Sequence, residues 1–363
     1  MLLPKLGLFL VIFTMMFSQK DLRPVRTVSI AQNLGVGSQP EIAVSADGII
    51  RIVYGVKKGK ERELYHILSD DGGKSYSKPF LVGNFSQMGL GMGRGPQLTT
   101  SKDYTVVTVG DHQGNLYALN LSNKTNQWST PIKVNDVDTT AKEALSGLGV
   151  GKDNLVYTAW LDSRLGNNNL FGAVSSDGGL TWGKNQLIYK GEQDGICDCC
   201  KPSVYINETG QITVMFRNKL NGARNMYLIS SNDNGKHFGQ ASKLGVGDYM
   251  INACPMDGGD LTVDSKGVAA TVWRRQMDVY FSQAGLPEIK LGHGRTPVIL
   301  QTPKGNVIAW QQDNIIQLRS PDGLTTFSLG TGKYPKLALA QDQQSVICIF
   351  ERDGQVMVTS VTI

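Results

Sequence analysis

Residues 175–182 read Ser-Ser-Asp-Gly-Gly-Leu-Thr-Trp, and variants of this stretch occur three more times along the 363-residue chain. Each copy has a Ser, an Asp two positions later and an aromatic residue seven positions later. The other copies are residues 69–76, 231–238 and 320–327. An Asp side chain can cap the backbone N–H groups of a tight turn, a Gly supplies a positive φ, and the aromatic ring can pack beneath the turn. The stretch therefore predicts a recurring hairpin turn in which the Asp has a structural role rather than a ligand-binding one.

The spacing of these turns indicates a repeat of roughly 50 residues, a length typical of propellers and solenoids. Seven short apolar segments each open a unit and are followed by a turn and a second apolar segment. They are residues 40–44, 96–100, 146–150, 202–206, 259–263, 297–301 and 335–340. The sequence therefore predicts an all-β fold, a β-propeller of four-stranded antiparallel blades. Seven blades are counted, and six are the alternative.

The beginning of the chain resembles the end of a unit. Residues 26–34 lead into Leu34-Gly35, as the predicted fourth strands of other units lead into Leu291-Gly292 and Leu329-Gly330. The last unit, residues 333–363, has only three strands of its own. We expect the N-terminal strand to complete it and close the ring, which leaves few sheet edges exposed.

Residues 1–19 have a basic start at Lys5 followed by about twelve apolar positions, a pattern typical of a secretory signal peptide. The run is short for a membrane span, which needs roughly 20 residues. We expect a signal peptide over residues 1–19, a single propeller domain over residues 20–363, and a secreted or periplasmic protein with no membrane span in the mature chain. An uncleaved N-terminal anchor is the alternative.

Composition narrows the choice of partner. The chain is 40% hydrophobic and 18% charged, as ordinary globular proteins are, and its net charge of +5 is too small for its length to indicate nucleic-acid binding. It contains no phosphate-binding loop, no serine nucleophile elbow and no pair of histidines at metal-binding spacing. We therefore expect a monomer with no cofactor and no resident metal.

The four turns resemble the Asp-box, or BNR, repeats of the sialidase-like β-propellers, over nearly the whole mature chain. Sialidases of that family have six blades, an Arg in a Phe/Tyr-Arg-Ile-Pro segment, two further arginines that bind a carboxylate, a Tyr/Glu nucleophile pair and an Asp as acid/base. This sequence has no such Arg-Ile-Pro segment, and its nearest counterparts are Arg23-Pro24 and Arg94-Gly-Pro96. The resemblance implies the fold more strongly than the activity.

In a four-stranded blade, the loops after the second strand and before the first strand lie on the face opposite the Asp-box turns. Arginines are concentrated in these loops, and their guanidinium groups suit the carboxylate or sulfate of an acidic saccharide. The candidates for substrate binding are Arg94, Arg164, Arg217, Arg274, Arg275 and Arg295. The alternative is that several of them pair with neighbouring carboxylates such as Asp162.

Two functions follow from this face. The first is a sialidase-like glycoside hydrolase of the exo type that binds and hydrolyses an acidic glycan or another anionic saccharide. Its catalytic candidates are the carboxylates Asp162, Asp257 and Glu143, with Tyr249 as a nucleophile. The second is a non-catalytic propeller that binds a glycan, peptide or protein through the same face.

Four of the five cysteines fall in loops that precede first strands of adjacent units. Cys197, Cys199 and Cys200 lie in one loop, and Cys254 lies in the next. In an exported protein we expect disulfides, with Cys199 or Cys200 bridged to Cys254. The alternative is a soft metal site, for copper(I) or zinc, made by these four thiolates with His293 nearby. Cys348 lies in an apolar strand and is expected to be buried.

Overall fold

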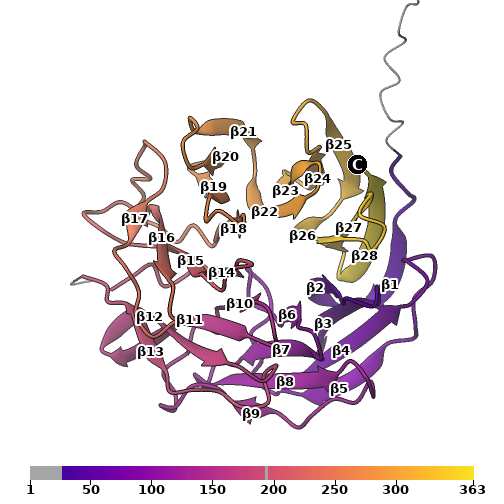
Figure 1. The fold of residues 1–363 in the computed structure, drawn as a ribbon, viewed down its shortest axis with the longest axis horizontal. Helices are drawn as coiled ribbons and strands as arrows, with labels where there is room; N and C mark the ends of the chain where they lie inside the picture. Colours follow the sequence, from indigo (N-terminus) through magenta and orange to yellow (C-terminus); the bar gives the residue numbers. More distant parts are fainter. Residues whose placement is uncertain (1–26, 193–194) are drawn as a thin grey trace, which may run out of the picture.

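The structure, a computed structural model, describes residues 27–192 and 195–363. The predicted signal peptide and Arg23 lie outside the described residues. These residues form seven four-stranded antiparallel sheets arranged as blades in a ring (Figure 1). The seven-bladed count from the sequence is confirmed. No helix in the described part of the chain is long and apolar enough to cross a membrane.

Six blades each take four consecutive strands, and the seventh takes its fourth strand from the start of the chain. Blade 1 contains β2 (Ser38–Val44), β3 (Ile50–Lys58), β4 (Glu61–Ser69) and β5 (Phe80–Asn84), and blade 2 contains β6 (Gln97–Thr100), β7 (Tyr104–Gly110), β8 (Leu116–Ser122) and β9 (Ile132–Lys133). Blade 3 contains β10 (Ser146–Val150), β11 (Val156–Leu165), β12 (Asn167–Ser175) and β13 (Gln186–Tyr189), and blade 4 contains β14 (Ser203–Ile206), β15 (Ile212–Arg217), β16 (Met226–Ser231) and β17 (Ser242–Lys243). Blade 5 contains β18 (Asp260–Val263), β19 (Ala269–Arg275), β20 (Asp278–Gln283) and β21 (Ile289–His293), and blade 6 contains β22 (Arg295–Thr302), β23 (Gly305–Gln312), β24 (Ile315–Arg319) and β25 (Thr326–Thr331). Blade 7 contains β26 (Lys333–Leu339), β27 (Ser345–Arg352), β28 (Gln355–Thr362) and β1 (Gln32–Val36).

The N-terminal strand closes the ring, as the sequence predicts. β1 pairs with β28 in antiparallel register from Gln32 opposite Val358 to Val36 opposite Gln355. The pairing begins further upstream, where Val28 forms a bridge with Val361. The strand ends at Val36, two residues beyond the predicted end. The last blade therefore has its outer edge covered by the start of the chain.

The hydrophobic core lies between neighbouring blades. Each of seven apolar clusters joins one pair of adjacent blades. Successive side chains of a strand point to opposite faces of the sheet, so each blade packs apolar side chains against both of its neighbours. At the closure, for example, Ile42 and Ile52 of blade 1 pack with Ile347 and Ile349 of blade 7. Because the ring is closed, every blade buries both of its faces against neighbouring blades.

The inner strands of blades 3 and 4 approach each other closely. A Cβ atom placed on Gly147 of β10 would lie 2.4 Å from the carbonyl oxygen of Pro202, just before β14. Any larger residue at this position would force the two blades apart. Glycine is therefore required here for the channel wall to close.

The four Asp-box turns have the structure that their sequence predicts. In the turn after β12, Asp177 accepts hydrogen bonds from the Ser175 hydroxyl at 2.7 Å and from the Thr181 N–H and hydroxyl at 2.9 and 2.6 Å. Gly178 and Gly179 adopt φ of 76° and 86°. The aromatic residues that close the four turns pack against the apolar clusters between blades. They are Tyr76, Trp182, Phe238 and Phe327. These carboxylates are occupied by their own turns.

Candidate functional site

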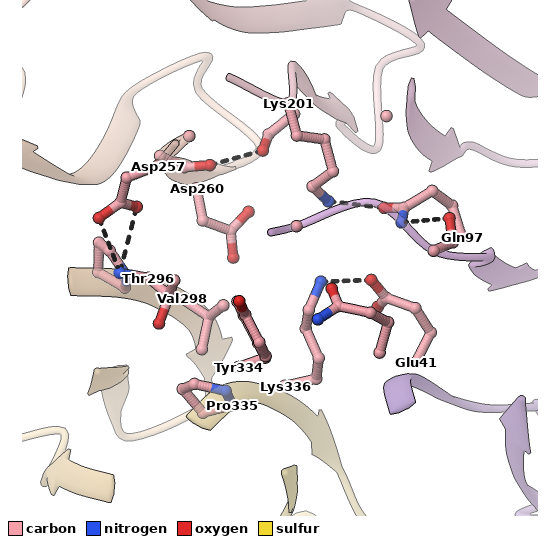
Figure 2. Close-up of a pocket in the computed structure, with 18 of the residues that line it drawn as sticks. Glu41, Gln97, Lys201, Asp257, Asp260, Thr296, Val298, Tyr334, Pro335 and Lys336 are labelled. Carbon is pink, nitrogen blue, oxygen red and sulfur yellow. Dashed lines mark hydrogen bonds and ion pairs between the residues drawn. The ribbon is translucent and has the colours of Figure 1, made fainter. Parts of the chain in front are cut away.

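A cavity of about 200 Å³ lies at the centre of the ring, where the inner strands begin. Because the Asp-box turns connect third to fourth strands, the starts of the first strands lie at the opposite face, where the sequence predicts the site. The polar side chains that line the cavity come from six blades, and Figure 2 labels most of them. They are Gln39, Glu41, Gln97, Lys201, Ser203, Asp257, Asp260, Thr296, Tyr334 and Lys336.

Two lysines carry the positive charge of the cavity. The ammonium groups of Lys201 and Lys336 point toward the same part of it (Figure 2). Lys336 forms an ion pair with Glu41. Lys201 donates to the amide oxygen of Gln97 at 2.6 Å, and no carboxylate of the described residues lies within ion-pair distance of its Nζ. Burial, followed by the positive charge of Lys336, lowers the pKa of Lys201 to about 8.

Two carboxylates line the cavity. Asp260 points into the cavity (Figure 2) and accepts hydrogen bonds at 3.0 Å from the N–H groups of Ile299 and Leu261. Burial raises its pKa above the ordinary value. Asp257 lines the wall, and both of its carboxylate oxygens lie within 3.1 Å of the Thr296 N–H. Burial raises the pKa of Asp257 to about 6, although the Thr296 hydrogen bond and nearby arginines act in the opposite direction.

Asp257 is one of the four predicted catalytic residues, and it is the one that the structure brings into the cavity. Asp162 is fully buried and accepts hydrogen bonds from Trp160 Nε1, the Thr140 hydroxyl and the Arg164 guanidinium at 2.8 to 2.9 Å. Burial raises the pKa of Asp162, but these hydrogen bonds outweigh burial and hold the pKa below its usual range. A carboxylate so completely occupied by its own blade has a structural role.

Two other predicted residues pair with each other. Arg94 donates through Nε to the Glu143 carbonyl at 2.7 Å and through Nη2 to the Glu143 carboxylate at 3.0 Å. Arg275 likewise forms a bidentate pair with Glu288 and lies over the ring of Tyr280. Arg94 and Arg275 are therefore paired with carboxylates of the protein itself, which was the alternative to ligand binding in the sequence analysis.

The remaining predicted residues surround the back of the cavity wall. Arg217 is buried and donates to the carbonyl oxygens of Asp257, Arg274 and Arg224. Tyr249 is also buried and lies beside the Arg217 guanidinium. Arg274 Nη1 lies 3.9 Å from the Asp257 carboxylate, and Arg295 is exposed. None of the six predicted arginines, all of them among the described residues, lines the central cavity.

Apart from Asp257, sequence reasoning missed the polar residues that line the cavity. Glu41, Gln97, Lys201, Tyr334 and Lys336 each flank a proline at the start of an inner strand. Each of these prolines marks the start of an inner strand, so the polar residues beside it could have been predicted to line the channel. The arginines in the surrounding loops predicted a binding site there instead.

The structure gathers four cysteines beside the cavity. The Sγ atoms of Cys197, Cys199 and Cys200 lie 3.6 to 3.9 Å from one another, and all three residues are buried. Cys254 is exposed and, with Asp198, lies within 4.8 Å of Cys199. All five cysteines are free thiols in this structure, so the disulfide stays a prediction. Cys348 is buried in the core between blades 6 and 7, as expected.

Comparison with known proteins agrees with this architecture. Residues 26–286 match the family model described as a BNR repeat-like domain. Among solved structures, the chain is similar to the Hadza microbial sialidase Hz136, with 13% identity, a TM-score of 0.54, and coverage of 92% of this chain and 68% of that one. It is similar to the Penicillium chrysogenum α-L-arabinanase complexed with arabinobiose, with 10% identity, a TM-score of 0.53, and coverage of 93% and 98%. It is also similar to a PL25 ulvan lyase, with 12% identity, a TM-score of 0.55, and coverage of 92% and 95%. Identities this low show a shared fold alone, and no curated protein sequence matches the chain.

Proposed function

Because the chain belongs to the family of proteins with a BNR repeat-like domain, we propose that it is an exported propeller that binds an acidic saccharide in its central cavity. The similar structures named as a sialidase, an arabinanase and an ulvan lyase support a saccharide as the class of ligand. Export rests on the predicted signal peptide. Fractionation of cells that express the full chain tests it, and retention in the cytoplasm would contradict it.

The observation that carries the proposal is the position of Lys201. Its ammonium group lies in the cavity against a neutral amide oxygen, whereas Lys336 is already paired with Glu41. A carboxylate or sulfate placed beside Lys201 would form a charge-assisted hydrogen bond, which is stronger than the bond to Gln97. The remaining polar groups of the wall, including Asp260 and Tyr334, suit the hydroxyl groups of a sugar ring.

The size of the cavity limits how much of a saccharide it accepts. At about 200 Å³ it is smaller than the roughly 300–1,000 Å³ of pockets that enclose drug-sized ligands. It therefore suits one sugar residue, the terminal unit of a chain, better than an internal segment of a polysaccharide.

Binding is tested by calorimetry with the free monosaccharides N-acetylneuraminate, glucuronate and galacturonate, and with neutral glucose and arabinose. We expect one site per chain and a preference for an acidic sugar. Lys201→Met should weaken that binding by about 10- to 100-fold, because it removes a hydrogen bond to a charged group worth about 1.5–3 kcal/mol. Lys133→Met removes a surface lysine that pairs with Asp138 and serves as the control. Equal binding by wild type and Lys201→Met would refute this role of the cavity.

Hydrolysis is a second candidate function, favoured by Asp257. A carboxyl group with a pKa of about 6 can donate a proton near neutral pH, and Asp260 provides a second carboxylate in the same cavity. A panel of fluorogenic acidic glycosides, including a sialoside, tests this function. We expect turnover to fall as pH rises through about 6, and Asp257→Asn to lose turnover while binding remains. Binding without turnover across the panel would favour the non-catalytic alternative.

A further inference from the structure

A cluster of sulfur atoms lies outside the groups used for saccharide binding. The loop between β13 and β14 turns so that Cys197, Cys199 and Cys200 place their thiols together, and Met256 from the loop before β18 packs against them. The three residues are 1%, 4% and 2% exposed. Three buried thiols that converge from one short loop form a preorganised donor set.

The spacing of the sulfur atoms is the spacing that a single metal ion requires. The Sγ separations are 3.6 Å between Cys197 and Cys199, 3.8 Å between Cys197 and Cys200, and 3.9 Å between Cys199 and Cys200. Thiolates bound about 2.3 Å from one ion lie about 3.8 Å apart at tetrahedral angles and about 4.0 Å apart at trigonal angles. One ion can therefore contact all three sulfurs with little movement of the loop.

The surroundings of the cluster complete a site. The ligand atoms of Asp198, in the same loop, and of Cys254, in the neighbouring loop, lie within 4.8 Å of Cys199 Sγ, so each offers a fourth ligand. Arg224 Nη1 donates to the Cys197 sulfur at 3.1 Å, which offsets the negative charge that bound thiolates would carry. His293, which the sequence placed nearby, is not part of either group of metal-ligand atoms among the described residues.

We propose that Cys197, Cys199 and Cys200 bind one thiophilic d¹⁰ metal ion, copper(I) or zinc, with Cys254 as the fourth ligand when the ion requires four. Soft thiolate ligands select these ions, and the trigonal set of three suits copper(I) while zinc takes four. A disulfide would draw two sulfurs to about 2.05 Å and leave the third without a partner, whereas the three observed separations are nearly equal. With Cys254 bound, the site would tie the loop of blade 4 to that of blade 5 at the wall of the cavity, which Cys199 and Met256 line. Its ligands are not among the groups proposed to bind the saccharide.

The test is metal binding by the whole protein, purified under reducing conditions without chelator. Elemental analysis measures the bound metal, and competition with bathocuproine disulfonate for copper(I) and with a chromophoric zinc chelator measures affinity for each ion. We expect one equivalent per chain, and X-ray absorption should show sulfur ligands at about 2.3 Å. The ion that elemental analysis finds in the protein as purified identifies the resident metal, and the two competition assays rank the protein's affinity for copper(I) and zinc.

Variants separate the site from general effects on folding. Cys197→Ser, Cys199→Ser and Cys200→Ser should each abolish stoichiometric binding, whereas Cys348→Ala removes a distant buried cysteine and should leave it intact. If the serine variants do not fold, Arg224→Gln should weaken the affinity by about 10- to 100-fold, as expected for loss of a group that contacts a ligand. The proposal would be overturned if the reduced wild type bound neither ion. It would also be overturned if the serine variants bound metal normally and Arg224→Gln had the same affinity as wild type. A native disulfide between these cysteines that persists in the exported protein would overturn it as well.

Discussion

Replacement of Asp162 by Ala distinguishes a structural carboxylate from a catalytic one. Asp162 was a catalytic candidate on its sequence position, but in the structure it holds Arg164 inside blade 3 and also accepts from Trp160 and Thr140. The side chain of Arg164 is 13% exposed and that of Asp162 is fully buried. Removal of the carboxylate leaves a largely buried guanidinium whose remaining charged partner is Asp136 at 2.7 Å.

The loss should be large because a largely buried guanidinium would lose the buried carboxylate that accepts from its Nε and Nη2, and only the exposed Asp136 would remain. Such changes typically destabilise a protein by about 3–5 kcal/mol. For a chain of 363 residues, an unfolding entropy of about 2.1 cal/mol/K per residue gives about 0.8 kcal/mol/K. The melting temperature should therefore fall by about 4–7 °C.

Calorimetry and urea unfolding measure this change, and Asp138→Ala, which removes an exposed partner of Lys133, provides the control. The Asp138 variant should melt close to wild type because exposed ion pairs contribute little.

The pKa of Asp162 is depressed in the folded protein. Its contribution to stability is therefore fully present above the unfolded pKa of about 3.9 and is lost as pH falls through the folded pKa. The difference between wild type and Asp162→Ala should therefore shrink below about pH 4. An unchanged melting temperature together with loss of ligand turnover would refute the structural assignment.

Three further outcomes follow from the ring and its cavity. Deletion of residues 27–36 should expose the edge of β28 and cause aggregation, seen by light scattering; a monomer with unchanged melting temperature would contradict closure by β1. Gly147→Ala places a Cβ 2.4 Å from the carbonyl of Pro202 and should destabilise the protein by about 1–3 kcal/mol in urea unfolding, whereas Gly239→Ala, with its nearest contact at 3.7 Å, should have little effect. Binding of an acidic sugar should weaken as pH rises through about 8, because Lys201 loses its proton there; calorimetry across pH 6–9 checks this, and a flat profile would exclude Lys201 as the cation.

The fold could be predicted because its determinants are local. The Asp-box turn needs Ser, Asp, Gly and an aromatic residue within eight positions, and each copy makes its own hydrogen bonds, as Asp177 does with Ser175 and Thr181. Ring closure was also predictable, because a last unit with three strands requires a fourth from elsewhere. The observed β1 starts six residues after and ends two residues after the predicted strand over residues 26–34, since strand ends depend on pairing with β28 that local sequence does not specify.

The site could be predicted only in part because its residues come from separate blades. Lys201, Asp260 and Lys336 are far apart in the sequence and meet only because three inner strands begin at the same point of the channel. Asp257 was found because it precedes an inner strand. The lysines beside the prolines were missed because a single Lys next to a Pro has no distinctive spacing.

The pairing of the arginines decides which cation remains for an acidic ligand. Arg94, Arg164 and Arg275 are bound to Glu143, Asp162 and Glu288, so their charge is already compensated within the protein. Breaking such a pair to bind a ligand would cost more than forming the new contact would return, since a carboxylate would lose its partner. Lys201 has no such cost, because the group that it would leave is the neutral amide of Gln97. On the proposal that the cavity binds an acidic saccharide, we therefore expect Lys201 in the channel, rather than these three arginines, to recognise its acidic group.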